Sequence, residues 1–217
     1  VLDLDHDADG NVPGCYARTT DNTKYKLHTT ATGIMDLTLS KNWSVQRNAT
    51  TKIVLDFDLR KSITYSDDNL RYRFVSSSNL SNAVRLVAKA KAGNIVGTYE
   101  ESLVTGADEV IVYAYKKGTF NAATETQAQG TDNLLFFNAV SSARVKSSLT
   151  GNSYTLALLE EGDYELHFAK YNDDGSGKMH FTNLLQAETT VNGAISGWVT
   201  LNANATTNIS TSITGLL

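Results

Sequence analysis

Cysteine, proline and excess basic charge are all scarce in this sequence, and each shortage excludes a class of protein. A single cysteine, Cys15, rules out an intramolecular disulfide, and a single proline rules out collagen-like and proline-rich chains. Lysine and arginine number 19 against 23 aspartates and glutamates, a formal charge of −4. The sequence therefore offers no basic face for nucleic acid. No apolar run approaches the ~18 residues that indicate a membrane-spanning helix.

The remaining composition is that of a folded, exported protein. The chain has 217 residues, 41% of them hydrophobic, which is enough to bury a core without disulfides. Serine and threonine make up about a fifth of the residues, and they favour turns and solvated strand faces over helix interiors. We therefore expect an extracellular or cell-surface location, with any export signal removed.

Apolar residues alternate with polar ones in short segments, and long stripes at helical spacing are absent from the sequence. This pattern predicts an all-β fold, because alternate side chains of a strand face opposite sides of its sheet. A polar stretch at 100–108 separates two strand-rich halves. We therefore predict two β-sandwich domains, 1–105, which begins with an aspartate-rich segment, and 106–217. The clearest strand patterns lie at 53–59, 84–90, 109–115 and 164–171.

Two stretches carry a family resemblance. The first, TKIVLDFDLRKSI at 51–63 with the strand patterns up to residue 99, resembles a family of bacterial and archaeal surface lipoproteins of unknown function. The second, around EVIVYAYKKG and YTLALLEEGDYELHFA, is similar to prealbumin-like (transthyretin-like) modules of the carboxypeptidase-regulatory type. Gly162 and Tyr164 fill the places of the turn glycine and corner tyrosine of those modules. The resemblance covers about residues 50–217 and implies a surface protein without catalysis. The family's usual opening strand is missing here.

An aspartate-rich segment at the start of the chain carries the best metal-binding motif. Its alternating carboxylates followed by Gly10 match the first six positions of a D-x-D-x-D-G calcium loop. Carboxylates at alternate positions surround a hard cation, and the glycine permits a sharp turn. The candidate calcium ligands are Asp3, Asp5, Asp7, Asp9 and Asn11, the last through its backbone carbonyl.

The twelfth position of this loop is Tyr16 instead of glutamate. A bidentate carboxylate would have to come from Asp3, from Asp21 or from another chain. On the strength of its carboxylate motif, we expect this segment to bind calcium as a cofactor. A solvated acidic tail and zinc binding through His6 are the alternatives.

Other polar residues favour structural roles over catalysis. Asp56 and Asp58 share one face of a predicted strand and are a candidate carboxylate pair. We expect them instead to face solvent or to pair with a nearby arginine. The four histidines show no metal-binding spacing, and no Ser-His-Asp arrangement is recognisable. The sequence thus predicts a protein that is not an enzyme.

Aromatic residues and the chain ends suggest two kinds of partner. Trp43, Trp198 and the ten tyrosines are candidates for a sugar-stacking platform, although packing on strand faces is the simpler interpretation. Both ends have strand-like alternation, so an end segment either pairs within its own sandwich or adds to a neighbour's sheet edge. Our leading hypothesis is a surface subunit that forms a homo-oligomer, filament or surface layer by strand addition, stabilised by calcium. The alternative is a ligand- or glycan-binding surface lipoprotein.

Overall fold

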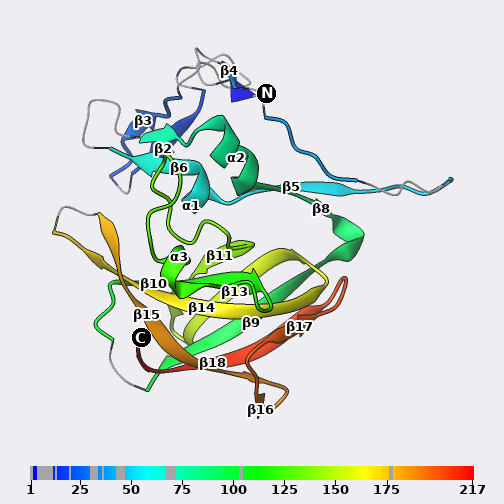
Figure 1. The fold of residues 1–217 in the computed structure, drawn as a ribbon, viewed down its shortest axis with the longest axis vertical. Helices are drawn as coiled ribbons and strands as arrows, with labels where there is room; N and C mark the ends of the chain where they lie inside the picture. Colours follow the sequence, from blue (N-terminus) through cyan, green and yellow to red (C-terminus); the bar gives the residue numbers. More distant parts are fainter. Residues whose placement is uncertain are drawn as a thin grey trace. The chain divides into compact units, whose positions relative to one another are not determined.

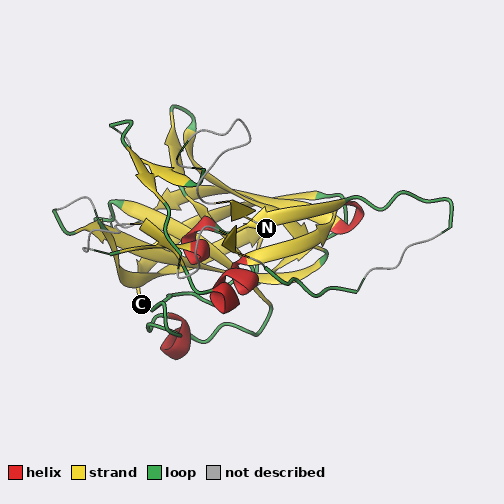
Figure 2. Ribbon diagram, turned by 90° about the horizontal axis from the view of Figure 1, so that it is seen from above, coloured by secondary structure: helices red, strands yellow, loops and turns green. Residues whose placement is uncertain are grey.

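A computed structural model describes residues 2–3, 12, 14–19, 21–29, 34–35, 37–42, 47–66, 72–102, 105–175 and 178–217. Strands dominate these residues, and the helices are short (Figures 1 and 2). The predicted all-β class is confirmed. No helix among the described residues is long and apolar enough to cross a membrane.

The chain forms two compact units, and both are assembled from separated segments. Unit 1 contains 1–45, 55–86 and 127–137, and unit 2 contains 46–54, 87–126 and 138–217. This grouping differs from the division at residue 105 expected from the sequence. The difference arises because a strand before residue 105 pairs with strands near the C-terminus, and a polar loop after it returns to unit 1.

Unit 1 contains short strand pairs and two helices. The first helix begins where Asp58 accepts a hydrogen bond from the backbone N–H of Arg60, at 3.1 Å. The strand predicted at 53–59 therefore ends early, because Asp58 caps a helix. The elements are β1 (Leu2–Asp3) paired with β4 (Ile34–Met35), β2 (Tyr16–Arg18) with β3 (Lys24–Lys26), β6 (Ile63–Tyr65) with β7 (Tyr72–Phe74), α1 (Leu59–Ser62) and α2 (Ser77–Ala83).

The core of unit 1 is small and includes Val75, Leu80, Ala83 and Leu134. Asp132 joins the loop to the start of α2, because its carboxylate accepts bonds from the backbone N–H and hydroxyl of Ser76 and from Asn79. Burial acts to raise the pKa of Asp132, but these hydrogen bonds outweigh it and lower the pKa below its ordinary value. A polar loop residue thus caps a helix distant in sequence.

A two-stranded ribbon and a ten-stranded sheet make up the remaining strands. The ribbon pairs β5 (Ile53–Phe57) with β8 (Val84–Ala88), followed by the 3₁₀ turn η1 (Lys89–Lys91). In the large sheet the strand order is β11-β10-β14-β15-β18-β9-β13-β12, with β16 beside β15 and β17 beside β14. The strands are β9 (Ala92–Glu101), β10 (Glu109–Lys116), β11 (Ser141–Arg144), β12 (Lys146–Ser148), β13 (Gly151–Glu160), β14 (Gly162–Asp173), β15 (Met179–Val191), β16 (Ala194–Ile195), β17 (Val199–Leu201) and β18 (Thr206–Leu216).

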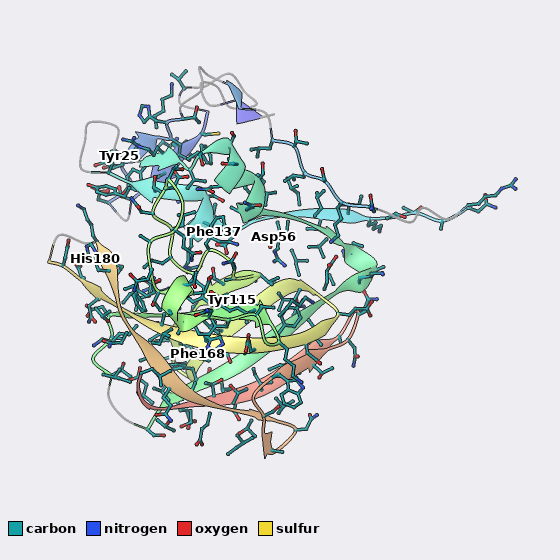
Figure 3. All side chains as sticks on the ribbon, viewed as in Figure 1. Tyr25, Asp56, Tyr115, Phe137, Phe168 and His180 are labelled. Atoms are coloured by element: carbon teal, nitrogen blue, oxygen red, sulfur yellow. The ribbon has the colours of Figure 1, made fainter. Side chains whose placement is uncertain are left out.

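The large sheet folds back on itself around one apolar core. Its two outermost strands, β11 and β12, are separated in the chain only by Val145, so the two ends of the strand order meet. Tyr164 and Phe168 are fully buried in this core together with Ile95, Leu156 and Ile213. Figure 3 shows Phe168 among the strands of unit 2. Alternate residues of β9 are buried, and β13 buries Tyr154 and Leu156 in the same way until a bulge shifts the register before Leu159.

Gly162 and Tyr164 form the corner that the sequence motif predicted. Gly162 has a φ of 141°, a conformation that side chains rarely adopt. The hydroxyl of Tyr164 donates to the backbone carbonyl of Glu160 at 2.6 Å and accepts from Lys116 Nζ at 2.8 Å. The tyrosine thereby fixes the turn between β13 and β14.

The C-terminal strand pairs inside its own sheet. β18 runs antiparallel to β15 and parallel to β9, with Ile209 opposite Val191 on one side and Gly97 on the other. The structure therefore agrees with pairing of this end within its own sandwich, and any strand added by a neighbour needs a different edge.

Candidate functional site

The predicted calcium ligands fall largely outside the described residues. Asp5, Asp7, Asp9 and Asn11 are not described, and for Asp3 only the backbone pairing with Ile34 is given. Among the residues that the structure describes, no three histidine, cysteine, aspartate or glutamate side chains gather as metal ligands. The calcium site therefore stays a prediction. His6, the candidate zinc ligand, also lies outside these residues.

The candidate carboxylate pair has structural roles. Asp56 forms an ion pair with Arg85, the partner type expected from the sequence. Asp58 caps α1, so the two carboxylates serve separate local structures. Asp173 accepts a bond from the backbone N–H of Gly175 at 2.8 Å, as a turn-forming aspartate does.

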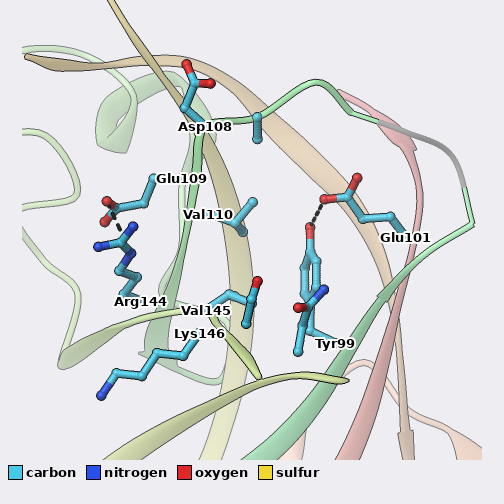
Figure 4. A pocket seen from close by; sticks show the side chains of 11 residues that line it. Tyr99, Glu101, Asp108, Glu109, Val110, Arg144, Val145 and Lys146 are labelled. Atoms are coloured by element: carbon cyan, nitrogen blue, oxygen red, sulfur yellow. Dashed lines mark hydrogen bonds and ion pairs between the residues drawn. The ribbon is translucent and has the colours of Figure 1, made fainter. Parts of the chain in front are cut away.

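A cavity of about 580 Å³ lies in unit 2 beside the start of β10 (Figure 4). Among its charged side chains, Glu101, Asp108, Glu109 and Arg144 are engaged with protein groups. Arg144 Nε lies 3.3 Å from Glu109 Oε2, and the hydroxyl of Tyr99 donates to Glu101 at 2.9 Å. Burial, followed by this bond to the carboxylate, raises the pKa of Tyr99. The tyrosine is therefore a neutral donor and the arrangement stabilises the fold.

Asp108, at the rim of this cavity, binds the neighbouring strand. It accepts hydrogen bonds from the backbone N–H of Asp173 and from the side-chain amide of Asn172. These bonds lower the pKa of Asp108. The bonds of Asp108 thus hold the start of β10 against the end of β14.

The half-paired strand β15 is the feature best suited to an interaction. β14 pairs with it over Met179–Leu185, whereas β18 pairs with it only from Leu185 to Val191. Residues 179–183, which we call the β15 edge, therefore have a strand neighbour on one side among the described strands. Met179 is 42% exposed at this edge, and Leu216 and Leu217 are exposed where β18 ends. A strand with a second strand on one side can extend its sheet by taking up a strand from another chain.

Sequence reasoning missed this edge and two other polar features. The clearest strand patterns of the sequence do not include β15, which has 13 residues. The buried carboxylate of Glu125 accepts bonds from Tyr115 and Asn138, and both it and the Asp132 cap lie in a polar stretch without a strand pattern. A polar segment gives no periodic signal for such long-range bonds.

Comparisons with known proteins add little to this description. No protein-family model matches the chain, and no curated protein matches it. Among solved structures, a pilus-presented adhesin, Cpa, matches with a TM-score of 0.24 and 15% identity, covering 57% of this chain and 27% of the adhesin. The chain thus spans about a quarter of that protein, and so low a similarity carries no argument. The resemblance to surface lipoproteins and prealbumin-like modules stays a hypothesis.

Proposed function

We propose that this protein is a non-enzymatic structural protein of the cell surface whose copies assemble by strand addition at the β15 edge. The observation that supports this most directly is the half-paired β15. A strand from a second copy, running antiparallel to β15, would extend the row that β18 begins. Main-chain hydrogen bonds supply the affinity in this mode of recognition.

The β15 edge is better suited to this role than the other ends of the sheet. β11 and β12 have four and three residues, which limits the ladder that a partner can form. The β15 edge has five residues and is flanked by the exposed side chains of Met179, Leu216 and Leu217. Burial of apolar surface would add to the hydrogen bonds of the ladder.

The test is light scattering after size exclusion on a Met179→Lys, Thr182→Lys double variant. We expect the wild type to exceed 23.6 kDa and the variant to elute as a monomer, because charged edge residues oppose strand addition. A dimer would indicate that two β15 edges pair with each other, and larger species would indicate pairing with a different segment.

A matched control places two lysines at β12, the strand at one end of the strand order. Ser147 and Leu149 lie at and just after the β12 edge, so Ser147→Lys, Leu149→Lys adds the same charge without touching β15. This control should assemble like the wild type. A monomeric wild type, or a control that dissociates while the β15 variant assembles, would contradict the proposal.

Calcium and location belong to the same proposal. The segment containing Asp3, Asp5, Asp7, Asp9 and Asn11 would bind Ca²⁺ and hold the N-terminal part of the subunit. Export to an extracellular or cell-surface site is supported by the composition, rich in serine and threonine. The alternative function, a ligand-binding surface lipoprotein, requires a monomer with a lipid anchor on its native N-terminus.

A further inference from the structure

A second cavity in unit 2, of about 690 Å³, differs from the first in its chemistry. It lies where the β15–β16 turn, the link to β17 and the start of β18 come together. Every residue that lines it is uncharged, which distinguishes it from the charged cavity beside β10. Among these residues are Asn192, Trp198, Thr200, Asn202, Thr207 and Asn208. We call this cavity the Trp198 groove.

Trp198 provides a fixed aromatic surface in this groove. Its side chain is 43% exposed, although large apolar side chains are usually covered. Ser196 holds its backbone on both sides, accepting from the N–H at 3.3 Å and donating to the carbonyl at 2.7 Å. Lys117 Nζ lies 3.3 Å from the ring centroid, so a ligand would use the opposite face of the indole.

Amides and hydroxyls surround the tryptophan. Asn192, Asn202 and Asn208 are exposed, and no hydrogen bond within the described part of the chain engages their side-chain amides. Each amide offers two donors and an acceptor, which matches hydroxyl groups that also donate and accept. Thr200, which also lines the groove, donates its hydroxyl to the carboxylate of Asp163 at 2.7 Å.

We propose that the Trp198 groove binds a neutral oligosaccharide, with one sugar ring stacked on the indole and its hydroxyls bonded to the asparagine amides. A sugar ring has an apolar C–H face and a polar rim, and the groove offers an aromatic face with a polar surround. Its volume lies within the range of small-ligand sites. The residues that line the groove are all uncharged, which favours neutral sugars, and the ammonium group of Lys117 is held against the indole ring.

This site is separate from the β15 edge, because it involves the opposite end of β15 and strands β16 to β18. Sugar binding by a monomeric protein would therefore support the Trp198 groove and contradict assembly. Assembly without sugar binding would support the β15 edge and contradict the groove.

The experiment is a fluorescence titration that reports on Trp198 alone. The sequence has two tryptophans, so a Trp43→Phe background leaves a single emitter. The probes are cellotriose, maltotriose and chitotriose, with sialyllactose as the anionic comparison. We expect a saturable change with at least one neutral trisaccharide and weaker binding of sialyllactose.

Isothermal titration of Trp198→Ala and Trp198→Phe in the native Trp43 background then tests the platform. Alanine should weaken binding at least about tenfold, whereas phenylalanine, which retains an aromatic face, should retain part of the affinity. Met179→Ala, an exposed apolar position outside the groove, should bind like the wild type. The proposal is overturned if none of the neutral probes saturates, or if Trp198→Ala binds as tightly as the wild type.

Discussion

At the scale of single residues, the hydroxyl of Tyr164 connects three chain segments. It joins the strand end at Glu160, the β14 backbone and Lys116 of β10, while its ring is fully buried. Tyr164→Phe keeps the ring and removes the hydroxyl. We expect a loss of about 1–2 kcal/mol in the free energy of unfolding, because a partly buried carbonyl loses its donor. Urea denaturation measures this.

Tyr16→Phe is the matched control, since Tyr16 is exposed and its ring lies beneath the Lys24 ammonium group. Its unfolding free energy should change by less than about 0.5 kcal/mol. Equal effects of the two substitutions would show that the corner hydroxyl contributes little.

The burial of His167 predicts that the stability of the fold depends on pH. Its ring stacks on Phe120 at a centroid distance of 3.6 Å and contacts Tyr115 edge-on. Burial lowers the pKa of His167 below its ordinary value of 6.5, although Glu165 acts in the opposite direction. The unfolded chain therefore binds a proton more readily than the native state. The contribution of the neutral ring to the free energy of unfolding is fully present above pH 6.5. It is lost as the pH falls through the pKa of His167 in the native state.

We predict that the urea midpoint of unfolding decreases when the pH is lowered from 7.5 to 5. The decrease should be larger in the wild type than in His167→Phe, which keeps a ring against Phe120. His180→Gln is the control, because His180 is exposed and pairs with Asp174 at 3.1 Å. If His167→Phe shows the full pH dependence of the wild type, another group is responsible.

At the scale of elements, β9 is a central strand of the large sheet although it precedes residue 105. It lies between β13 and β18, and buries Ile95 and Tyr99 in the large core. A fragment of residues 106–217, the domain expected from the sequence, would lack this central strand. We predict that it fails to give a cooperative thermal transition by circular dichroism, because β13 and β18 lose their shared partner.

A fragment of residues 87–217 restores β9 and is the matched comparison. It should unfold cooperatively, with the near-ultraviolet signal of packed tyrosines. Cooperative unfolding of the shorter fragment would instead establish residues 106–217 as an independent domain.

The helices show why element type was harder to predict than the β class. α2 has the sequence SSNLSNA, which has only two apolar side chains that the core can bury, Leu80 and Ala83. Its first turn is capped by Asp132, which lies more than 50 residues away. Local propensity cannot report such a partner, so this helix follows from tertiary contacts.

At the scale of the whole molecule, the aspartate-rich segment predicts calcium-dependent assembly. Light scattering in excess calcium should give a larger species than in excess chelator, because removal of the ion leaves several like charges together. Asp5→Asn, Asp7→Asn should behave in calcium as the wild type does in chelator. Asp108→Asn is a control outside the segment. If the molar mass is the same in calcium and in chelator, assembly does not depend on a bound metal ion.

The sequence by itself determined the β class and the strand patterns at 109–115 and 164–171, which lie in β10 and β14. The resemblance to prealbumin-like modules added the corner at Gly162 and Tyr164. These features depend on alternation and on residues that act on their neighbours in the chain. The calcium motif was also visible there, and it awaits measurement.

Only the tertiary structure decided the pairing of β18 with β9, the grouping of three chain segments into each unit, the half-paired β15 and the Trp198 groove. Each requires residues far apart in sequence to meet: Gly97 lies opposite Ile209, and Lys117 lies against Trp198. Alternation along a strand shows which side chains are buried, but it carries no information on which strand lies alongside. The partner is chosen by packing and backbone hydrogen bonding in the complete fold.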